Sequence, residues 1–295
     1  MYPAHISIYE VGPRDGLQNE APLHIADKIN LIEGLAAAGI QRIEAGSFVS
    51  PKWVPQMADS AAVCQQITRA PKVRYSALTP NITGLKHAVA VGMDEIAVFT
   101  AASETFCQHN IHCSISQSLA RFEAVFTEAQ RLNLPVRAYV SCVLGCPYEG
   151  DIAAEQVAAV AHTLLEMGAY EVSLGDTIGV GTPAKVRRML DTVSVCVPPA
   201  QLALHFHDTY GQALANVLAC LDSGIATIDS AVAGLGGCPY ARGSSGNLAT
   251  EDLLYMLHGL GIHTGIDVKQ LASVGQQVCQ RLGIVNRSKV ALALL

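Results

Sequence analysis

The segment EVSLGDTIGVGTPAKVRRMLDTVSVCV (residues 171–197) contains one strand–helix unit. Residues 171–177 have the β-branched and apolar character of a strand that is covered on both faces. Residues 182–197 form a helical pattern, which begins with a threonine suited to an N-cap, Thr182, and a proline at the first helical position, Pro183. The segment therefore predicts a strand followed closely by a helix.

The same unit recurs along the chain. Strands are predicted at 6–13, 42–48, 73–79, 95–102, 135–143, 171–177, 202–209 and 227–235. Helical patterns are found at 26–39, 114–132, 153–168, 182–197, 211–224 and 249–261. Strand–helix alternation of this kind indicates parallel strands joined by crossover helices. Eight strands in about 240 residues predict an α/β fold, a closed (β/α)8 TIM barrel.

An open, doubly wound sheet is the alternative arrangement of such units. It would require a G-x-G-x-x-G phosphate fingerprint near the first strand, and the sequence has none there. A further helical pattern, DVKQLASVGQQVCQRLG (267–283), follows the last unit. No low-complexity linker or charge run marks a second domain. We expect a barrel catalytic domain over 1–261, with a short helical C-terminal extension over 262–295 packed on it.

Composition and charge exclude several classes of protein. The chain has 295 residues, 50% of them hydrophobic, which is enough to bury a large core. A formal net charge of −6 argues against nucleic acid as the main partner. No apolar run reaches the roughly 18 residues that span a bilayer, and the N-terminus resembles neither a signal peptide nor a transit peptide. We expect a cytoplasmic protein with no membrane partner.

The cysteines do not form a disulfide or zinc pattern. There are nine, an odd number, and no C-x-x-C pair occurs. Most are expected to be small core residues. Cys238 differs, because it lies in GLGGCPYARGSSGN (234–247), a glycine-rich loop after the last predicted strand. An exposed thiol on such a loop can act as an acid.

Polar side chains gather where the predicted strands end. In a (β/α)8 barrel the active site forms at the carboxyl ends of the strands. Buried charges are costly unless they are paired or bind a metal, so this concentration indicates a functional site. The candidates are Arg14, Asp15, Glu44, Ser47, Tyr139, Ser141, Asp176, His205, His207, Asp208, Cys238, Arg242 and Asn247.

The stretch LHFHDTYGQ (204–212) places two histidines on one strand. His205 and His207 point to the same face, because residues two apart in a strand do so. Strands 7, 8 and 1 are neighbours in a closed barrel, so Asp15 should converge with them. Imidazole, carboxylate and amide ligands with room for substrate oxygens favour Mg²⁺ or Mn²⁺. Asp208 lies on the opposite face and is expected to support a turn.

Several of these residues also have a structural interpretation. Arg14 and Asp15 could form an ion pair at the barrel rim. Glu44 could orient Arg14 by pairing with it, and Asp176 could cap the following helix. The histidines on helices and loops, among them His109, have no partner pattern and are expected to be structural.

Six segments together resemble the 3-hydroxy-3-methylglutaryl-CoA lyases. They are EVGPRDGLQNE (10–20), SFVSPKWVPQM (47–57), YVSCVLGCPYEG (139–150), SLGDTIGVGTP (173–183), HFHDTYGQALAN (205–216) and GLGGCPYARGSSGNLATED (234–252). The Arg-Asp pair and the H-x-H are similar to those of a wider group of metal-dependent TIM-barrel lyases and Claisen-type synthases. The first and last segments favour the lyases.

The resemblance implies a barrel that binds Mg²⁺ or Mn²⁺ and cleaves (S)-3-hydroxy-3-methylglutaryl-CoA to acetyl-CoA and acetoacetate, as in leucine degradation. The implied metal ligands are Asp15, His205, His207 and Asn247. The implied catalytic residues are Arg14, Asp15, Glu44, Asp176, His205 and Cys238. Substrate binding is assigned to Arg14, Gln18, Ser47 and Tyr139. A homodimer is expected from the family, and a chain ending KVALALL is expected to be of the bacterial type, without a terminal thiol switch.

The implied reaction is a retro-Claisen cleavage. The C3 hydroxyl loses a proton, the C2–C3 bond breaks, and the thioester leaves as an enolate. Arg14 is expected at the thioester oxygen, and Cys238 is expected to protonate the enolate carbon. Asp15, a water at the metal and a histidine are all candidates for accepting the hydroxyl proton. Two other interpretations stay open, a condensing acyl-CoA synthase and a non-catalytic barrel that binds metal or CoA.

Overall fold

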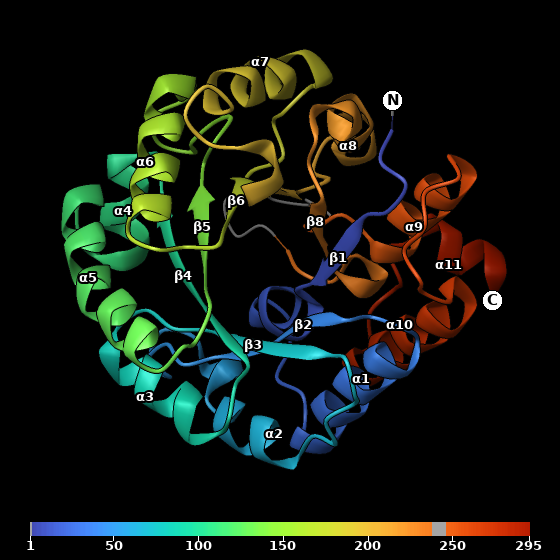
Figure 1. The fold of residues 1–295 in the computed structure, drawn as a ribbon. Coiled ribbons are helices and arrows are strands. Elements are labelled where there is room, and N and C mark those ends of the chain that lie inside the picture. The colour runs from blue at the N-terminus through green and yellow to red at the C-terminus, as the bar shows by residue number, and fades with distance from the viewer. Residues whose placement is uncertain (1, 238–245) are drawn as a thin grey trace.

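The computed structural model describes residues 2–237 and 246–295, and within them eight strands form a closed parallel barrel in chain order (Figure 1). The strands are β1 (Ser7–Glu10), β2 (Arg42–Ser47), β3 (Arg74–Leu78), β4 (Glu95–Ala101), β5 (Val136–Ser141), β6 (Glu171–Asp176), β7 (Leu202–Phe206) and β8 (Thr227–Ser230). β1 pairs with β8 and closes the barrel. The predicted (β/α)8 fold is therefore confirmed, and the open sheet is excluded.

Helices surround the barrel (Figure 1). They are α1 (Ile25–Ala37), α2 (Ser60–Gln66), α3 (Ile82–Ala90), α4 (Glu104–Ile111), α5 (Ile115–Arg131), α6 (Ala154–Glu166), α7 (Pro183–Val193), α8 (Ala213–Cys220), α9 (Thr250–Gly259), α10 (Val268–Leu282) and α11 (Lys289–Leu294). The sequence predicted α1 and α5 to α10, apart from their ends. It missed α2, α3, α4 and α11, which have six to nine residues each, although it found α8, which has eight. Pro183 begins α7 as predicted, but the Thr182 side chain makes no capping hydrogen bond.

The first strand is shorter than predicted. It ends at Glu10, and residues 12–16 form a single π-helical turn, η1, that carries Arg14 and Asp15. The backbone N–H groups of Arg14 and Gly16 both donate to the carbonyl of Val11. Pro13 has no N–H to donate to a strand ladder, which favours the departure from the sheet. Arg14 and Asp15 therefore project from a helical turn at the end of β1 and not from the strand itself.

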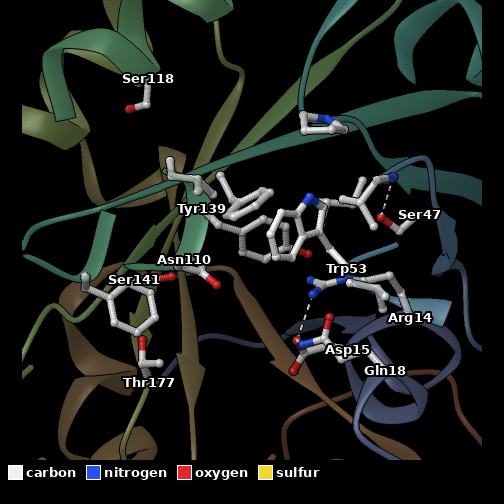
Figure 2. Close-up of a pocket in the computed structure, with 18 of the residues that line it drawn as sticks. Arg14, Asp15, Gln18, Ser47, Trp53, Asn110, Ser118, Tyr139, Ser141 and Thr177 are labelled. Carbon is white, nitrogen blue, oxygen red and sulfur yellow. Dashed lines mark hydrogen bonds and ion pairs between the residues drawn. The ribbon is translucent and has the colours of Figure 1, made fainter. Parts of the chain in front are cut away.

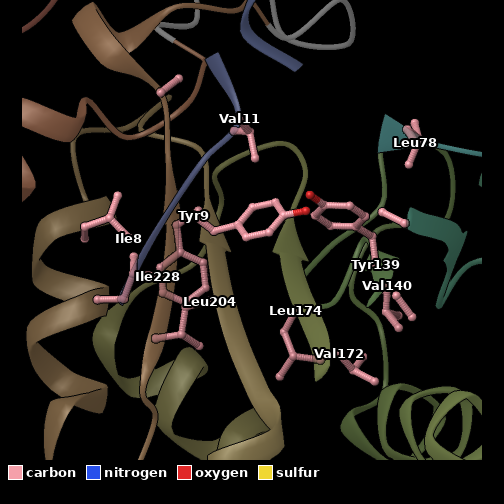
Figure 3. Packing of buried hydrophobic residues seen from close by; sticks show 14 of the residues in the cluster. Ile8, Tyr9, Val11, Leu78, Tyr139, Val140, Val172, Leu174, Leu204 and Ile228 are labelled. Carbon is pink, nitrogen blue, oxygen red and sulfur yellow. The ribbon is translucent and has the colours of Figure 1, made fainter. Parts of the chain in front are cut away.

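Inside the barrel, a polar layer lies beneath this turn. Tyr9 of β1 and Tyr139 of β5 reach toward one another across the interior (Figure 3). The Tyr9 hydroxyl donates to Glu95 at 3.0 Å, and the guanidinium of Arg137 lies 4.0 Å from the centre of the Tyr9 ring. Arg137 is fully buried and pairs with two carboxylates, so its charge is compensated. These buried and mutually paired side chains fill the barrel interior below its mouth.

The C-terminal helices complete the ring of helices. α10 packs against α1 and α9, and α11 packs against α9 and α10. Ser288, at the start of α11, donates a 2.6 Å hydrogen bond to Asp252 of α9. The division into domains 1–261 and 262–295 stays a prediction. Among the described residues, no helix combines the length and the apolar character needed to cross a membrane.

Candidate active site

A cavity of about 840 Å³ opens at the carboxyl ends of the strands (Figure 2). In Figure 2, Arg14, Asp15 and Gln18 lie at one side of it, and Tyr139 and Ser141 of β5 line its wall. The ends of β2 to β7, or the loops after them, contribute further lining residues: Ser47, Leu78, Phe99, Tyr139, Val140, Ser141, Gly175, Thr177, His205 and His207. The cavity thus occupies the place where a barrel of this kind performs its chemistry.

Three predicted metal ligands come together in this cavity. One ligand atom from each of Asp15, His205 and His207 lies within 4.8 Å of the others. The Nε2 atom of His205 is 3.9 Å from Oδ2 of Asp15. Asn247 forms an isolated β-bridge with His207, and its Nδ2 donates to the same Asp15 oxygen at 2.8 Å. The predicted fourth ligand therefore adjoins the cluster.

The protonation states of these side chains fit a divalent cation. Nδ1 of His207 is buried and has no hydrogen-bond partner among the described residues. Burial and the neighbouring His205 lower the pKa of His207 to about 4, so its ring is neutral. Burial opposes ionisation of Asp15, but Arg14 and the two imidazoles hold its pKa at about 2. A neutral imidazole, a carboxylate and an amide oxygen suit Mg²⁺ or Mn²⁺.

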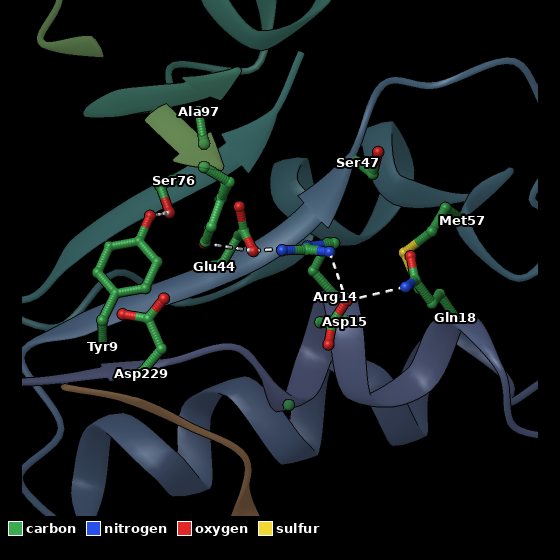
Figure 4. Close-up of polar contacts among 12 residues, drawn as sticks. Tyr9, Arg14, Asp15, Gln18, Glu44, Ser47, Met57, Ser76, Ala97 and Asp229 are labelled. Carbon is green, nitrogen blue, oxygen red and sulfur yellow. Dashed lines mark hydrogen bonds and ion pairs between the residues drawn. The ribbon is translucent and has the colours of Figure 1, made fainter. Parts of the chain in front are cut away.

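Arg14 is held in one orientation beside this cluster (Figure 4). Its Nε donates to Glu44 at 2.6 Å and its Nη1 donates to Asp15 at 2.7 Å. The Tyr139 hydroxyl also donates to Glu44, at 3.1 Å, and Gln18 donates to Asp15 at 2.8 Å. Burial lowers the pKa of Arg14, but the Glu44 and Asp15 carboxylates together with Tyr139 more than offset this effect, so the guanidinium stays charged. The site presents a fixed cation next to a potential metal site.

Comparison with known proteins agrees with this arrangement. The HMGL-like family profile matches residues 5–278. The chain belongs to the HMGL-like family. It is 58% identical over 294 residues to the 3-hydroxy-3-isohexenylglutaryl-CoA/hydroxy-methylglutaryl-CoA lyase of Pseudomonas aeruginosa, with 99% of this chain and 98% of the relative covered. It is 55% identical to the cytoplasmic 3-hydroxy-3-methylglutaryl-CoA lyase of Mus musculus, with 99% and 85% covered.

Solved structures of HMGL-like proteins share the whole fold. The hydroxymethylglutaryl-CoA lyase of Pseudomonas aeruginosa superposes with a TM-score of 0.97 at 57% identity, covering 99% of this chain and 98% of that one. An HMG-CoA lyase of Acinetobacter baumannii in complex with coenzyme A and 3-methylmalate gives 0.93 at 38% identity, covering 98% and 95%. The resemblance inferred from the six sequence segments is therefore confirmed.

Other predicted residues of this HMGL-like chain lie in different surroundings. Ser47 lines the cavity, and its Oγ accepts a hydrogen bond from the Val49 backbone. Asp176 lies outside the cavity lining and accepts hydrogen bonds from the backbone N–H groups of Val180 and Gly181. Burial raises the pKa of Asp176 to about 6. Asp176 therefore holds the loop between β6 and α7. This is close to the structural role that the sequence suggested for it, a cap of the following helix. Cys238 and Arg242 lie outside the described residues.

Sequence reasoning missed several residues in or beside the HMGL-like site, among them His109 and Asp229. His109, expected to be structural, lines the cavity from α4, a helix that the sequence did not predict. Asp229 of β8 lies 3.3 Å from Nδ1 of His205. A signal for Asp229 was present, because a carboxylate in the middle of a predicted strand that is covered on both faces needs a buried partner. No local signal distinguished His109.

Proposed function

We propose that the chain is a divalent-metal-dependent carbon–carbon lyase that cleaves (S)-3-hydroxy-3-methylglutaryl-CoA to acetyl-CoA and acetoacetate. The observation that carries this proposal is the cluster of Asp15, His205 and His207 beside the fixed guanidinium of Arg14, in one cavity at the barrel mouth. Relatives of 55–58% identity over nearly the whole chain are named as lyases for this substrate, which supports the assignment.

The bound metal would be held by Asp15, His205, His207 and Asn247, with Mg²⁺ or Mn²⁺ as the proposed ion. When bound, such an ion supplies a Lewis acid for the hydroxyl and carboxylate end of the substrate. Nδ2 of Asn247 donates to Asp15 and to the Leu235 carbonyl, so Oδ1 is the atom that it would offer to a metal. These two hydrogen bonds orient the amide before any ligand arrives.

Arg14 would stabilise the enolate that forms when the C2–C3 bond breaks. Glu44 and Asp15 hold its Nε and Nη1, and the hydrogen bonds found among the described residues leave Nη2 for a ligand. A donor fixed before reaction needs no reorganisation as negative charge develops on the thioester oxygen. Asp15 and a histidine stay the predicted protein groups for accepting the hydroxyl proton. Cys238 stays the predicted proton donor to the enolate carbon.

The cavity also supports an acyl-CoA with a larger substituent at C3. Its wall includes five large apolar side chains beyond the polar cluster: Leu78, Phe99, Phe106, Ile111 and Phe122. The Pseudomonas aeruginosa relative is named for both a 3-isohexenyl and a 3-methyl substrate. We propose the isohexenyl homologue as a second substrate, to be tested by comparing kcat/KM for the two thioesters. A condensing synthase has no comparable support, because the similar proteins are named lyases.

Cellular context and assembly are proposed from the family. We propose that the chain acts in the cytoplasm, as a homodimer, in leucine degradation. Several of its relatives are named as cytoplasmic or mitochondrial enzymes. Light scattering of the purified chain tests the dimer, and growth of a deletion strain on leucine tests the pathway. A monomeric mass, or normal growth on leucine, would refute the corresponding assignment.

The activity is tested by incubating the purified chain with the thioester and Mg²⁺, with and without EDTA, and measuring acetoacetate. We expect product that depends on the metal. CoA or metal binding without any acetoacetate would instead support a non-catalytic barrel and would overturn the proposed function.

A further inference from the structure

A carboxylate of β8 contacts the back of the His205 ring. Asp229 lies directly opposite His205 in the β7–β8 ladder. Its Oδ2 is 3.3 Å from Nδ1 of His205, while the other ring nitrogen, Nε2, faces Asp15 at 3.9 Å. The two nitrogens of this ring thus have different partners, one in the barrel interior and one in the cavity.

We propose that Asp229 is a positioning residue that holds the His205 ring with its proton on Nδ1, leaving Nε2 as the metal ligand. This proposal rests on the proposed metal site of Asp15, His205 and His207. A neutral imidazole has one N–H and one lone pair, so fixing the proton on Nδ1 places the lone pair on Nε2. Carboxylates that hold a ligating histidine in this way also set the orientation of its ring.

The surroundings of Asp229 allow its carboxylate only to accept hydrogen bonds. Arg137 donates to Oδ1 at 2.6 Å and to Oδ2 at 3.1 Å, and Ser173 donates to Oδ2 at 2.7 Å. The residue is 1% exposed, so no solvent competes for its oxygens. A carboxylate paired with a guanidinium in this manner is ionised and has no proton to give. His205 must therefore be the donor across the 3.3 Å contact.

Arg137 is fixed in turn by the polar layer below. Its Nε donates to Glu171 at 2.6 Å, and its guanidinium lies over the rings of Tyr9 and Tyr139. Glu171, Arg137, Asp229 and His205 are all buried, and the contacts that join them in this order link specific atoms. The orientation of a cavity histidine is thus determined by side chains that do not line the cavity.

A purely structural role for Asp229, as the counter-ion of Arg137, makes a different prediction. Glu171 has that role too, but no hydrogen bond or ion pair joins it to His205. Glu171→Gln is therefore a matched control for Asp229→Asn. In Asp229→Asn, an amide N–H replaces one acceptor. If the new amide N–H faces His205, it donates to Nδ1, so the ring proton has to move to Nε2. If the amide N–H faces Arg137, two hydrogen-bond donors oppose each other.

The first test measures Mn²⁺ binding to the purified full-length chain. Free Mn²⁺ is quantified by its electron paramagnetic resonance signal, and the concentration of binding-competent protein is corrected for the folded fraction measured by circular dichroism. We expect Asp229→Asn to raise the Kd about 10- to 100-fold. Glu171→Gln removes a charge but keeps an oxygen that can accept from Nε of Arg137, so it should destabilise the protein and leave the Kd within about twofold of wild type. Equal Kd values for Asp229→Asn and wild type would overturn the proposal, while Mn²⁺-dependent lyase activity of the wild type would still support the proposed function.

A second measurement does not depend on the folding of a variant. Nitrogen-15 spectra of the histidine side chains in the wild-type protein without metal report which ring nitrogen is protonated, and the His205→Asn spectrum assigns the signals. At a pH at which the His205 ring carries a single proton, we expect that proton on Nδ1 and not on Nε2. A proton on Nε2 would overturn the proposal, whatever the activity of the enzyme.

Discussion

Exchange of Arg14 for lysine tests whether the geometry of this side chain matters beyond its charge. The guanidinium reaches Glu44 through Nε at 2.6 Å and Asp15 through Nη1 at 2.7 Å, and no hydrogen bond among the described residues occupies Nη2. A lysine ammonium is a single point on a flexible stem. It can approach one carboxylate, but it cannot span both and also present a fixed donor to the cavity.

The expected magnitude follows from the loss of one oriented donor. A donor that stabilises an oxyanion contributes about 3–4 kcal/mol to the barrier. Since 1.36 kcal/mol corresponds to a factor of ten, kcat should fall about 10²- to 10³-fold. KM should change little, because the contact strengthens only in the transition state. Stability should also fall, because Glu44 is fully buried and loses its best partner.

The assay is steady-state formation of acetoacetate at saturating Mg²⁺, with the folded fraction measured by circular dichroism. Arg131→Lys is a matched control, since Arg131 also pairs with a carboxylate, Glu128, but is exposed on α5. That exchange should leave kcat unchanged. If Arg14→Lys kept kcat within fivefold of wild type, the argument from preorganised geometry would be wrong.

Three further predictions follow from the site and its supports. His207→Asn should raise the Kd for Mn²⁺ more than about 100-fold, as measured by calorimetry, because it removes a ligand and not merely a supporting group; an unchanged Kd would exclude His207 from the site. Asp176→Asn should lower kcat/KM about tenfold with an unchanged Kd for Mn²⁺, because it disturbs only the loop at Val180 and Gly181; a weaker Mn²⁺ affinity would contradict this separation. Burial raises the pKa of Glu251 to about 8, so the folded state binds more protons than the unfolded state between about pH 5 and pH 8. The free energy of unfolding should therefore fall as the pH rises through this range, by at most about 1.4 kcal/mol per pH unit. Urea titrations should show a flatter profile for Glu251→Gln, and an identical slope would refute this origin.

Local sequence determined the barrel because its physical causes are local. Strands covered on both faces are apolar throughout, and the helices between them repeat an apolar period, so both are visible in short windows. Helices of two turns or fewer, such as α2 and α11, show too little of a period to be recognised. The π-helical turn at residues 12–16 was missed as well: Gly12 and Pro13 indicate that the strand ends there, but no local pattern shows that the chain then forms a helical turn.

For the site, the sequence alone determined which residues could act together. The spacing of His205 and His207 defines a shared face, and the segments that carry Arg14, Asp15 and Asn247 identify the family. Tertiary structure alone decided how these side chains are held. The pairing of His205 with Asp229, 24 positions away, depends on the register of β7 against β8. Closure of the whole barrel sets that register, so no short stretch of sequence contains it.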